Sequence, residues 1–283
     1  MELPITPQVK QLIRQAIAED LSRKDVTTKV LISPTQMSKA LVLVKDKGVI
    51  AGIEIAKEVF LEVDPKLEVD IIIKDGAEVK AGDVVVKIEG KTSSILKAER
   101  VALNFLQHLS GIASETARYV LAVKGLSVYI TDTRKTTPGL RALEKYAVFV
   151  GGGKNHRMHL ADLILIKDNH IAALKHRGLN IKEITAKAHH KAPPQLKIEI
   201  EVKTLEEALQ AAEAGADIIM LDNMSLDDMR QAVRLVKGHA LLEASGGITL
   251  ENVRAVAETG VDRISIGALT HSPKALDISL ELE

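Results

Sequence analysis

The chain has 283 residues, and its 38 lysine and arginine side chains balance its 38 aspartate and glutamate side chains. Hydrophobic residues make up 46% of the sequence, which fits one large domain or two smaller ones and excludes a disordered chain. The zero net charge and the low aromatic content disfavour nucleic-acid binding. The absence of cysteine excludes disulfides, thiolate zinc sites and cysteine nucleophiles.

The first residues, MELPITPQVKQ, lack the basic region and apolar run of a secretory signal. No apolar stretch approaches the roughly 18 residues that a membrane span needs. We therefore expect a cytoplasmic protein that makes no contact with a membrane.

The first hundred residues predict a small α+β domain with a mostly antiparallel sheet. Apolar residues at helical spacing indicate a helix over residues 7–21, with Thr6 as its N-cap. Another helix is expected over residues 53–61. Three strand-like runs, separated by glycine turns, cover residues 39–45, 67–73 and 84–88. A long helical stretch follows over residues 95–123, and Gly111 predicts a break or a kink within it.

The rest of the chain alternates between strands and helices, which predicts parallel βαβ units. The strand-like runs cover residues 127–130, 163–166, 198–202, 218–221, 241–244 and 263–266, and helices are expected over 204–214, 226–236 and 250–259. Six strands fit either an open doubly wound sheet or an α/β barrel with fewer than eight strands. Glycine loops after the last two strands, at Gly246-Gly247 and at Gly267, favour the barrel, because barrels bind phosphate at such loops.

The zero net charge conceals two segregated blocks. Residues 131–170 carry seven basic and four acidic side chains together with three histidines, whereas residues 199–222 carry seven acidic side chains and one lysine. Most of the acidic side chains are expected on helix surfaces. Glu201 and Asp222 differ, because each ends an apolar strand where barrel active sites lie, and two such carboxylates could hold Mg²⁺.

Basic side chains also follow successive strands. Arg134 and Lys135 follow the run at 127–130, Lys167 ends the run at 163–166, and the loop 151–157 is rich in glycine and cationic groups. Together they predict one anion-binding pocket, with a solvated basic face as the alternative. The histidines lack the companions of a zinc site, and neither a GxGxxG loop nor a Walker A loop is present.

Seven motifs in order carry a specific resemblance: TDTRKTTPGLR, GGGKNHR, LILIKDNHI, IEIEV, AGADIIMLDN, EASGGIT and IGALTHS. Together they resemble the quinolinate phosphoribosyltransferase family over nearly the whole chain. The resemblance implies an N-terminal α+β open-sandwich domain over residues 1–110, to which residues 272–283 return. An incomplete α/β barrel over residues 111–271 is implied to follow.

The resemblance also implies a reaction and its site. Quinolinate and phosphoribosyl pyrophosphate (PRPP) would give nicotinate mononucleotide, pyrophosphate and CO₂ with Mg²⁺, in NAD biosynthesis. The residues that match the quinolinate pocket are Arg134, Lys135, His156, Arg157 and Lys167. The residues that match the ribose and Mg²⁺ carboxylates are Glu201 and Asp222, and those that match the 5′-phosphate loop and its neighbours are Ser245, Gly246, Gly247, Gly267 and His271. Catalytic roles fall to Lys135, Lys167, Glu201 and Asp222.

Arg100 matches an arginine that reaches into the neighbouring subunit's site in this family, which implies a homodimer with shared active sites that assembles further, as far as a hexamer. Two other functions stay open at this stage. One is a relative of the same architecture that acts on a different base or acid, and the other is a non-catalytic phosphosugar-binding protein.

Overall fold

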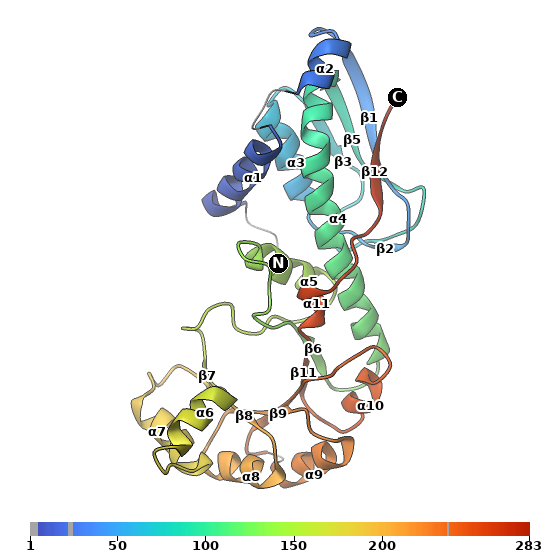
Figure 1. Cartoon of the computed structure of the whole chain (residues 1–283). Coiled ribbons are helices and arrows are strands. Elements are labelled where there is room, and N and C mark those ends of the chain that lie inside the picture. Colours follow the sequence, from blue (N-terminus) through green and yellow to red (C-terminus); the bar gives the residue numbers. More distant parts are fainter. Residues whose placement is uncertain (1–4, 22–24, 237) are drawn as a thin grey trace. The chain divides into compact units, whose positions relative to one another are not determined.

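The computed structural model describes residues 5–21, 25–236 and 238–283, and the chain divides into two compact units (Figure 1). The first unit consists of Met1–Ala117, Thr136–Gly152 and Leu269–Glu283, and the second of Arg118–Lys135 and Gly153–Ala268. The expected domains are 1–110 and 111–271, whereas residues 111–117, 136–152 and 269–271 also group with the first unit. None of the helices within the described ranges is long and apolar enough to cross a membrane.

The first unit combines helices with antiparallel strands. Its helices are α1 (Pro7–Asp20), α2 (Val26–Leu31), α3 (Ile53–Val63), most of α4 (Thr92–Ala122), α5 (Arg141–Val150) and most of α11 (Ala268–His271). Its strands are β1 (Met37–Val44), β2 (Gly48–Val49), β3 (Glu68–Ile71), β4 (Glu78–Val79), β5 (Val84–Lys91) and β12 (Ile278–Leu282). The predicted N-cap of α1 is confirmed, because the Thr6 hydroxyl accepts a hydrogen bond from the Val9 N–H at 3.3 Å.

The main sheet of the first unit has the strand order β12-β1-β5-β3, and all its pairs are antiparallel. The buried side chains alternate along β1, and the register places Ala40 opposite Ile88 and Val42 opposite Val86, all of them buried. This period of two gives the sheet one apolar face. Strand β12 pairs with β1, so the end of the chain joins this sheet, as expected for residues 272–283.

Helix α4 runs over 31 residues without interruption, so the predicted break at Gly111 is wrong. The glycine has a packing reason instead. A Cβ atom at this position would collide with the backbone of Lys274 and Ala275, so glycine lets the chain pass close to the helix.

The second unit contains a sheet of six parallel strands. They are β6 (Tyr129–Thr131), β7 (Ile164–Ile166), β8 (Ile198–Val202), β9 (Ile218–Asp222), β10 (Leu241–Ser245) and β11 (Arg263–Ser265). The intervening helices are α6 (Asp168–Lys175), α7 (Ile181–Lys191), α8 (Leu205–Glu213), α9 (Leu226–Val236) and α10 (Val253–Ala257).

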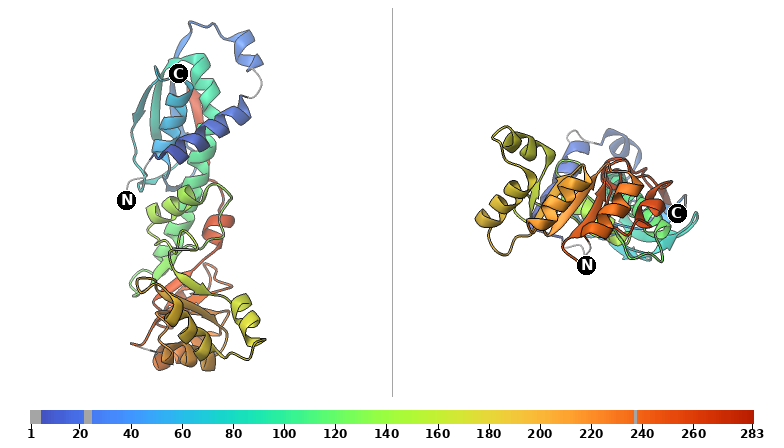
Figure 2. Two further views of the ribbon diagram at one scale, coloured as in Figure 1. Left: turned by 90° about the vertical axis from the view of Figure 1, so that its left-hand side faces the viewer. Right: turned by 90° about the horizontal axis from the view of Figure 1, so that it is seen from below.

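The strand order decides between the two predicted architectures. It reads β6-β11-β10-β9-β8-β7, which is the circular order of a barrel opened between β6 and β7. A doubly wound sheet would reverse its order at its centre and carry helices on both faces, whereas Figure 2 shows α8 and α9 covering one face. The incomplete α/β barrel with fewer than eight strands is therefore confirmed.

Candidate functional site

A cavity of about 330 Å³ lies within the second unit, at the carboxyl ends of its strands. The residues that line it are Thr133, Arg134, Lys135, His156, Arg157, Leu165, Lys167, Glu201, Met220, Asp222, Glu243, Ser245 and Ser265. Active sites of α/β barrels lie at this end of the strands. The cavity joins seven of the residues with predicted site roles, from the basic and the acidic block alike, together with Ser245.

Strand periodicity explains this set. Side chains two residues apart on one strand point to the same face. Leu165 and Lys167 therefore share a face at β7, Met220 and Asp222 share one on β9, and Glu243 and Ser245 share one on β10. The same rule places Glu199 on the face of Glu201. The inner face of this barrel is therefore strongly polar at one end.

The basic side of the cavity consists of Arg134, Lys135, Arg157 and Lys167. Burial lowers the pKa of Arg157, and the nearby positive charge of Arg134 lowers it further. One guanidinium nitrogen of Arg157 donates to the Leu163 carbonyl at 3.1 Å. Two guanidinium groups close enough to affect each other form a site that favours an anion with more than one oxygen.

The remaining basic residues of this block lie outside the cavity lining and make other contacts. The Lys154 amine lies 3.1 Å from the centroid of the Tyr129 ring, and the Arg141 side chain donates to the Thr136 hydroxyl. Lys145 is fully buried in the first unit. The basic block predicted the kind of pocket, but only four of its seven lysines and arginines line it.

The loop that carries Arg157 is hydrogen-bonded to the buried carboxylate of Asp132. The Asn155 side-chain amide donates to one oxygen of Asp132 at 2.7 Å, and the His156 main-chain N–H donates to the other at 2.8 Å. Lys154 also bridges to Thr131 on β6. The loop is glycine-rich, but these bonds fix its second half against the barrel.

The acidic side of the cavity consists of Glu201 and Asp222 on neighbouring strands. Burial raises the pKa of Glu201, and the negative charge of Asp222 raises it further, while Lys167 opposes the shift. Two carboxylates that repel each other in a partly dehydrated cavity suit a divalent cation, because a cation between them removes the repulsion.

The glycine loop after β10 depends on Asn223. This asparagine has a left-handed backbone with a φ of 54°, and its side-chain amide donates to Asp222 Oδ1 at 2.9 Å. Gly246 also has a left-handed backbone, and a Cβ atom there would collide with the Asn223 side chain. Glycine is therefore required at Gly246 both by its φ and by the close approach. Asn223 thereby links the Asp222 carboxylate to the predicted phosphate loop.

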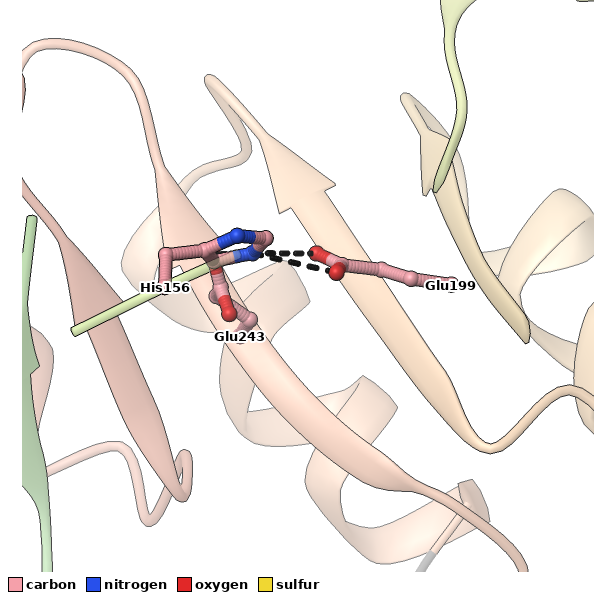
Figure 3. Close-up of side chains that lie close together, drawn as sticks. All are labelled: His156, Glu199 and Glu243. Atoms are coloured by element: carbon pink, nitrogen blue, oxygen red, sulfur yellow. Dashed lines mark hydrogen bonds and ion pairs between the residues drawn. The ribbon is translucent and has the colours of Figure 1, made fainter. Parts of the chain in front are cut away.

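One histidine and two carboxylates form a buried cluster at the cavity, and two of its members, His156 and Glu243, belong to the cavity lining (Figure 3). The His156 Nε2 atom is 3.0 Å from Glu199 Oε2 and 3.6 Å from Glu243 Oε1. Both glutamates are fully buried, and the histidine ring is 6% exposed. Burial and then the charge of Glu199 raise the pKa of Glu243 to about 7.

The other predicted site residues lie outside the lining of this cavity. Gly246 and Gly247 follow β10, and Gly267 precedes α11. Arg100 and His271 belong to the first unit, where His271 Nδ1 is 2.6 Å from the Ser272 hydroxyl. Their roles stay predictions.

Sequence reasoning missed Glu199, Glu243, Asp132 and Asn223. A signal for the first two was present, because Glu199 is two residues before Glu201 and Glu243 is two residues before Ser245. Period-two alternation then places each of them on the inner face, one layer deeper. A glutamate in the middle of a mostly apolar strand needs a reason, since barrel interiors are dominated by branched aliphatic side chains.

Comparison with known proteins gives two family matches. The model described as "Quinolinate phosphoribosyl transferase, N-terminal domain" matches residues 25–110, and the one described as "Quinolinate phosphoribosyl transferase, C-terminal domain" matches residues 112–281. Together they span most of the chain.

Individual relatives agree with these models. The chain is 43% identical over 275 residues to the "Probable nicotinate-nucleotide pyrophosphorylase [carboxylating]" of Bacillus subtilis, covering 97% of this chain and 93% of the relative. It is 42% identical to the mitochondrial "Quinolinate phosphoribosyltransferase [decarboxylating] 2" of Nicotiana glauca, covering 98% and 83%. The crystal structure of NadC from Streptococcus pyogenes superposes with a TM-score of 0.94 at 44% identity, covering 100% of this chain and 99% of that one.

Proposed function

The chain belongs to the quinolinate phosphoribosyltransferase family, and from this membership we propose that it transfers the phosphoribosyl group of PRPP to quinolinate. The pyridine ring then loses its 2-carboxylate, and the products are nicotinate mononucleotide, pyrophosphate and CO₂. The observation that carries the proposal is the cavity itself. It joins four cationic side chains to a pair of carboxylates at the carboxyl ends of parallel strands.

The basic side fits quinolinate, which is a pyridine with two neighbouring carboxylates. Arg134 and Arg157 supply planar groups that bind carboxylates through two parallel hydrogen bonds, and Lys135 and Lys167 add point charges. A ring held through its carboxylates needs no aromatic platform, which agrees with an aromatic content of 2%.

The acidic side fits the ribose and a magnesium ion. Glu201 and Asp222 would hold Mg²⁺ directly or through water, because carboxylate oxygens are among the ligands that this ion takes. When bound, the ion supplies positive charge that stabilises a departing pyrophosphate. The same carboxylates face the positive charge that develops on the ribose ring, and Ser245, Gly246 and Gly247 would bind the 5′-phosphate with Gly267 beside them.

The chemistry divides into two steps. The quinolinate nitrogen attacks C1 of the ribose, and the bond from C1 to the pyrophosphate oxygen breaks, with negative charge from Glu201 and Asp222 stabilising the cationic ribose. The bond from C2 of the ring to its carboxylate then breaks, and the electron pair stays on C2 beside the quaternary nitrogen until a proton replaces the CO₂. Lys135 and Lys167 orient the anionic groups in both steps.

We also propose a homodimer, which extends to a hexamer, in which Arg100 of one protomer reaches the site of its partner. A cytoplasmic location stays a prediction. Sedimentation of the wild-type protein and of Arg100→Ala tests the assembly, and mixing inactive Arg100→Ala with inactive Asp222→Asn tests the sharing. Recovered activity in the mixture supports shared sites, and no recovery in a proven mixed dimer contradicts them.

Release of labelled CO₂ tests the reaction. The folded protein is incubated with quinolinate labelled in its 2-carboxylate, PRPP and Mg²⁺, and nicotinate replaces quinolinate in a parallel reaction. Release that requires PRPP, with no nucleotide formed from nicotinate, supports the proposal. Nucleotide formation from nicotinate alone would assign a different acceptor, and absence of any release from folded protein would overturn the proposal.

A further inference from the structure

The buried cluster extends below the groups that the proposed reaction uses. His156 and Glu243 line the cavity, whereas Glu199 lies outside its lining, two residues before Glu201 on β8. Both of its glutamates are fully buried on the inner face of the barrel, where an aliphatic side chain would cost far less to bury. Each of its three residues offers one atom that could bind a metal ion, and these three atoms lie within 4.8 Å of one another. The hydrogen bonds of His156 indicate what the cluster does.

Both ring nitrogens of His156 are engaged by the protein. Nδ1 accepts the main-chain N–H of Arg157 at 2.8 Å, so it carries no proton. The proton of the neutral ring is therefore on Nε2, which lies 3.0 Å from Glu199 Oε2 and 3.3 Å from Glu199 Oε1. The ring thus joins the buried Glu199 carboxylate to the backbone of Arg157.

We infer that Glu199 is a positioning residue for the anionic substrate: through the ring of His156, it fixes the backbone at Arg157 and thereby the guanidinium in the cavity. The inference rests on the proposed function and deepens it, because it gives the buried Glu199, which does not line the cavity, a part in substrate binding. Asp132 accepts hydrogen bonds from the Asn155 side chain and the His156 main chain. Glu199, on β8, contacts the His156 ring itself.

The two buried glutamates have different places in this arrangement. Glu199 lies at hydrogen-bond distance from Nε2, whereas the nearest oxygen of Glu243 is 3.6 Å away. Figure 3 shows Glu199 facing the edge of the imidazole ring, with Glu243 below the ring. The orientation of the ring therefore depends on Glu199.

Calorimetry of substrate binding tests the inference without requiring turnover. Glu199→Leu keeps the volume and removes a buried charge, so the barrel should still fold. We expect quinolinate to bind about tenfold more weakly, because a tenfold change in affinity corresponds to the net free energy of one or two hydrogen bonds. PRPP binding should be unchanged. Glu199→Gln keeps an oxygen acceptor for Nε2–H and should bind quinolinate within about threefold of wild type.

A double-mutant cycle tests whether Glu199 affects quinolinate binding through Arg157. In an Arg157→Ala background, Glu199→Leu should weaken quinolinate binding no further, because the group that it positions is gone. Asp217→Asn is the matched control, since the Asp217 carboxylate accepts the main-chain N–H of Ile198 on the same strand, away from the cavity. It should leave quinolinate binding unchanged.

The ¹⁵N shifts of the His156 ring provide a readout on the wild-type protein alone. A protonated Nε2 and an unprotonated Nδ1 support the inference. A proton on Nδ1, additive losses in the cycle, or equal weakening of quinolinate and PRPP would overturn it. Loss of the Nε2 proton on addition of Mg²⁺ would also overturn it, because the cluster would then be a metal site. If wild type binds quinolinate without releasing CO₂, the proposed function fails while these binding measurements still decide the role of Glu199.

Discussion

The two main sheets of this chain use their buried faces in opposite ways. In the first unit, β1 and β5 bury alanine, valine and isoleucine against each other, with Ala40 opposite Ile88 and Val42 opposite Val86. In the second unit, the inner face of β8 and β10 buries Glu199 and Glu243. Buried carboxylates destabilise a fold unless they are compensated, so the second sheet gives up stability in order to place charges.

This difference predicts where a mutation changes chemistry and where it changes only stability. The inner face of the parallel sheet should control substrate binding and turnover, whereas the buried face of the antiparallel sheet should control the free energy of unfolding. Three substitutions test this division, and a fourth, Glu243→Gln, tests the stability that the buried carboxylates cost. They are taken in order of decreasing expected effect.

Asp222→Asn should lower kcat by about a hundredfold or more, the range seen when one group that stabilises transition-state charge is removed. Quinolinate binding should be nearly unchanged, because Asp222 lies on the acidic side of the cavity. Steady-state kinetics with both substrates, together with calorimetry of quinolinate, give the two numbers. An unchanged kcat would contradict the assignment of this carboxylate.

Arg134→Ala should raise the KM for quinolinate by about 10- to 100-fold, because a charge-assisted hydrogen bond contributes about 1.5–3 kcal/mol. The KM for PRPP should change little. Equal increases for both substrates would show that Arg134 supports the cavity generally and does not recognise the dicarboxylate. Arg254→Ala is a control at an exposed arginine on α10, and it should change neither KM.

Glu243→Gln should alter the pH dependence of stability. The pKa of Glu243 is raised from 4.5 to about 7 in the folded protein, so the native state binds a proton that the unfolded state releases. The wild type should therefore lose stability as the pH rises from about 4.5 to about 7, by roughly 1–3 kcal/mol from this group.

The glutamine variant lacks this loss, so its stability relative to wild type should increase over that interval and stay level above it. Urea unfolding at pH 5, 6, 7 and 8 measures the difference. A difference that does not vary with pH would show that Glu243 is ionised throughout.

Ile88→Val should destabilise the first unit by about 1 kcal/mol, since it removes one buried methylene from a packed sheet. Both KM values and kcat should stay at their wild-type values. Urea unfolding measures the loss of stability, and steady-state kinetics measure KM and kcat. A change in kcat would contradict the prediction that the antiparallel sheet controls stability alone.

Much of the second unit could be predicted from the sequence, because each short apolar run is bounded by polar or glycine residues. The carboxyl ends of the runs identified Glu201, Asp222 and Lys167 as site residues, since strand ends of a barrel converge. The deeper layer was missed. Glu199 and Glu243 lie inside the strand-like runs at 198–202 and 241–244, and their partner His156 comes from a distant loop.

Other elements left weaker signals. Helix α5 begins without a capping side chain, and its sequence RALEKYAVFV follows a basic stretch that reads as a loop. The role of Gly111 depends on residues more than 160 positions later in the chain, at Lys274 and Ala275. Local propensity contains no information about such a contact, so it predicts only the helix-breaking role that glycine has in isolated helices.

The position of β12 has a consequence for the order in which the chain can fold. Strand β1 is synthesised before the barrel, and its partner β12 is synthesised after it. Until then, one edge of β1 lacks its hydrogen-bonding partner, and the whole barrel is synthesised in between. An unpaired strand edge is a template for pairing with another chain. Nascent chains of this protein therefore carry an open strand edge throughout the synthesis of the barrel, until β12 pairs with β1.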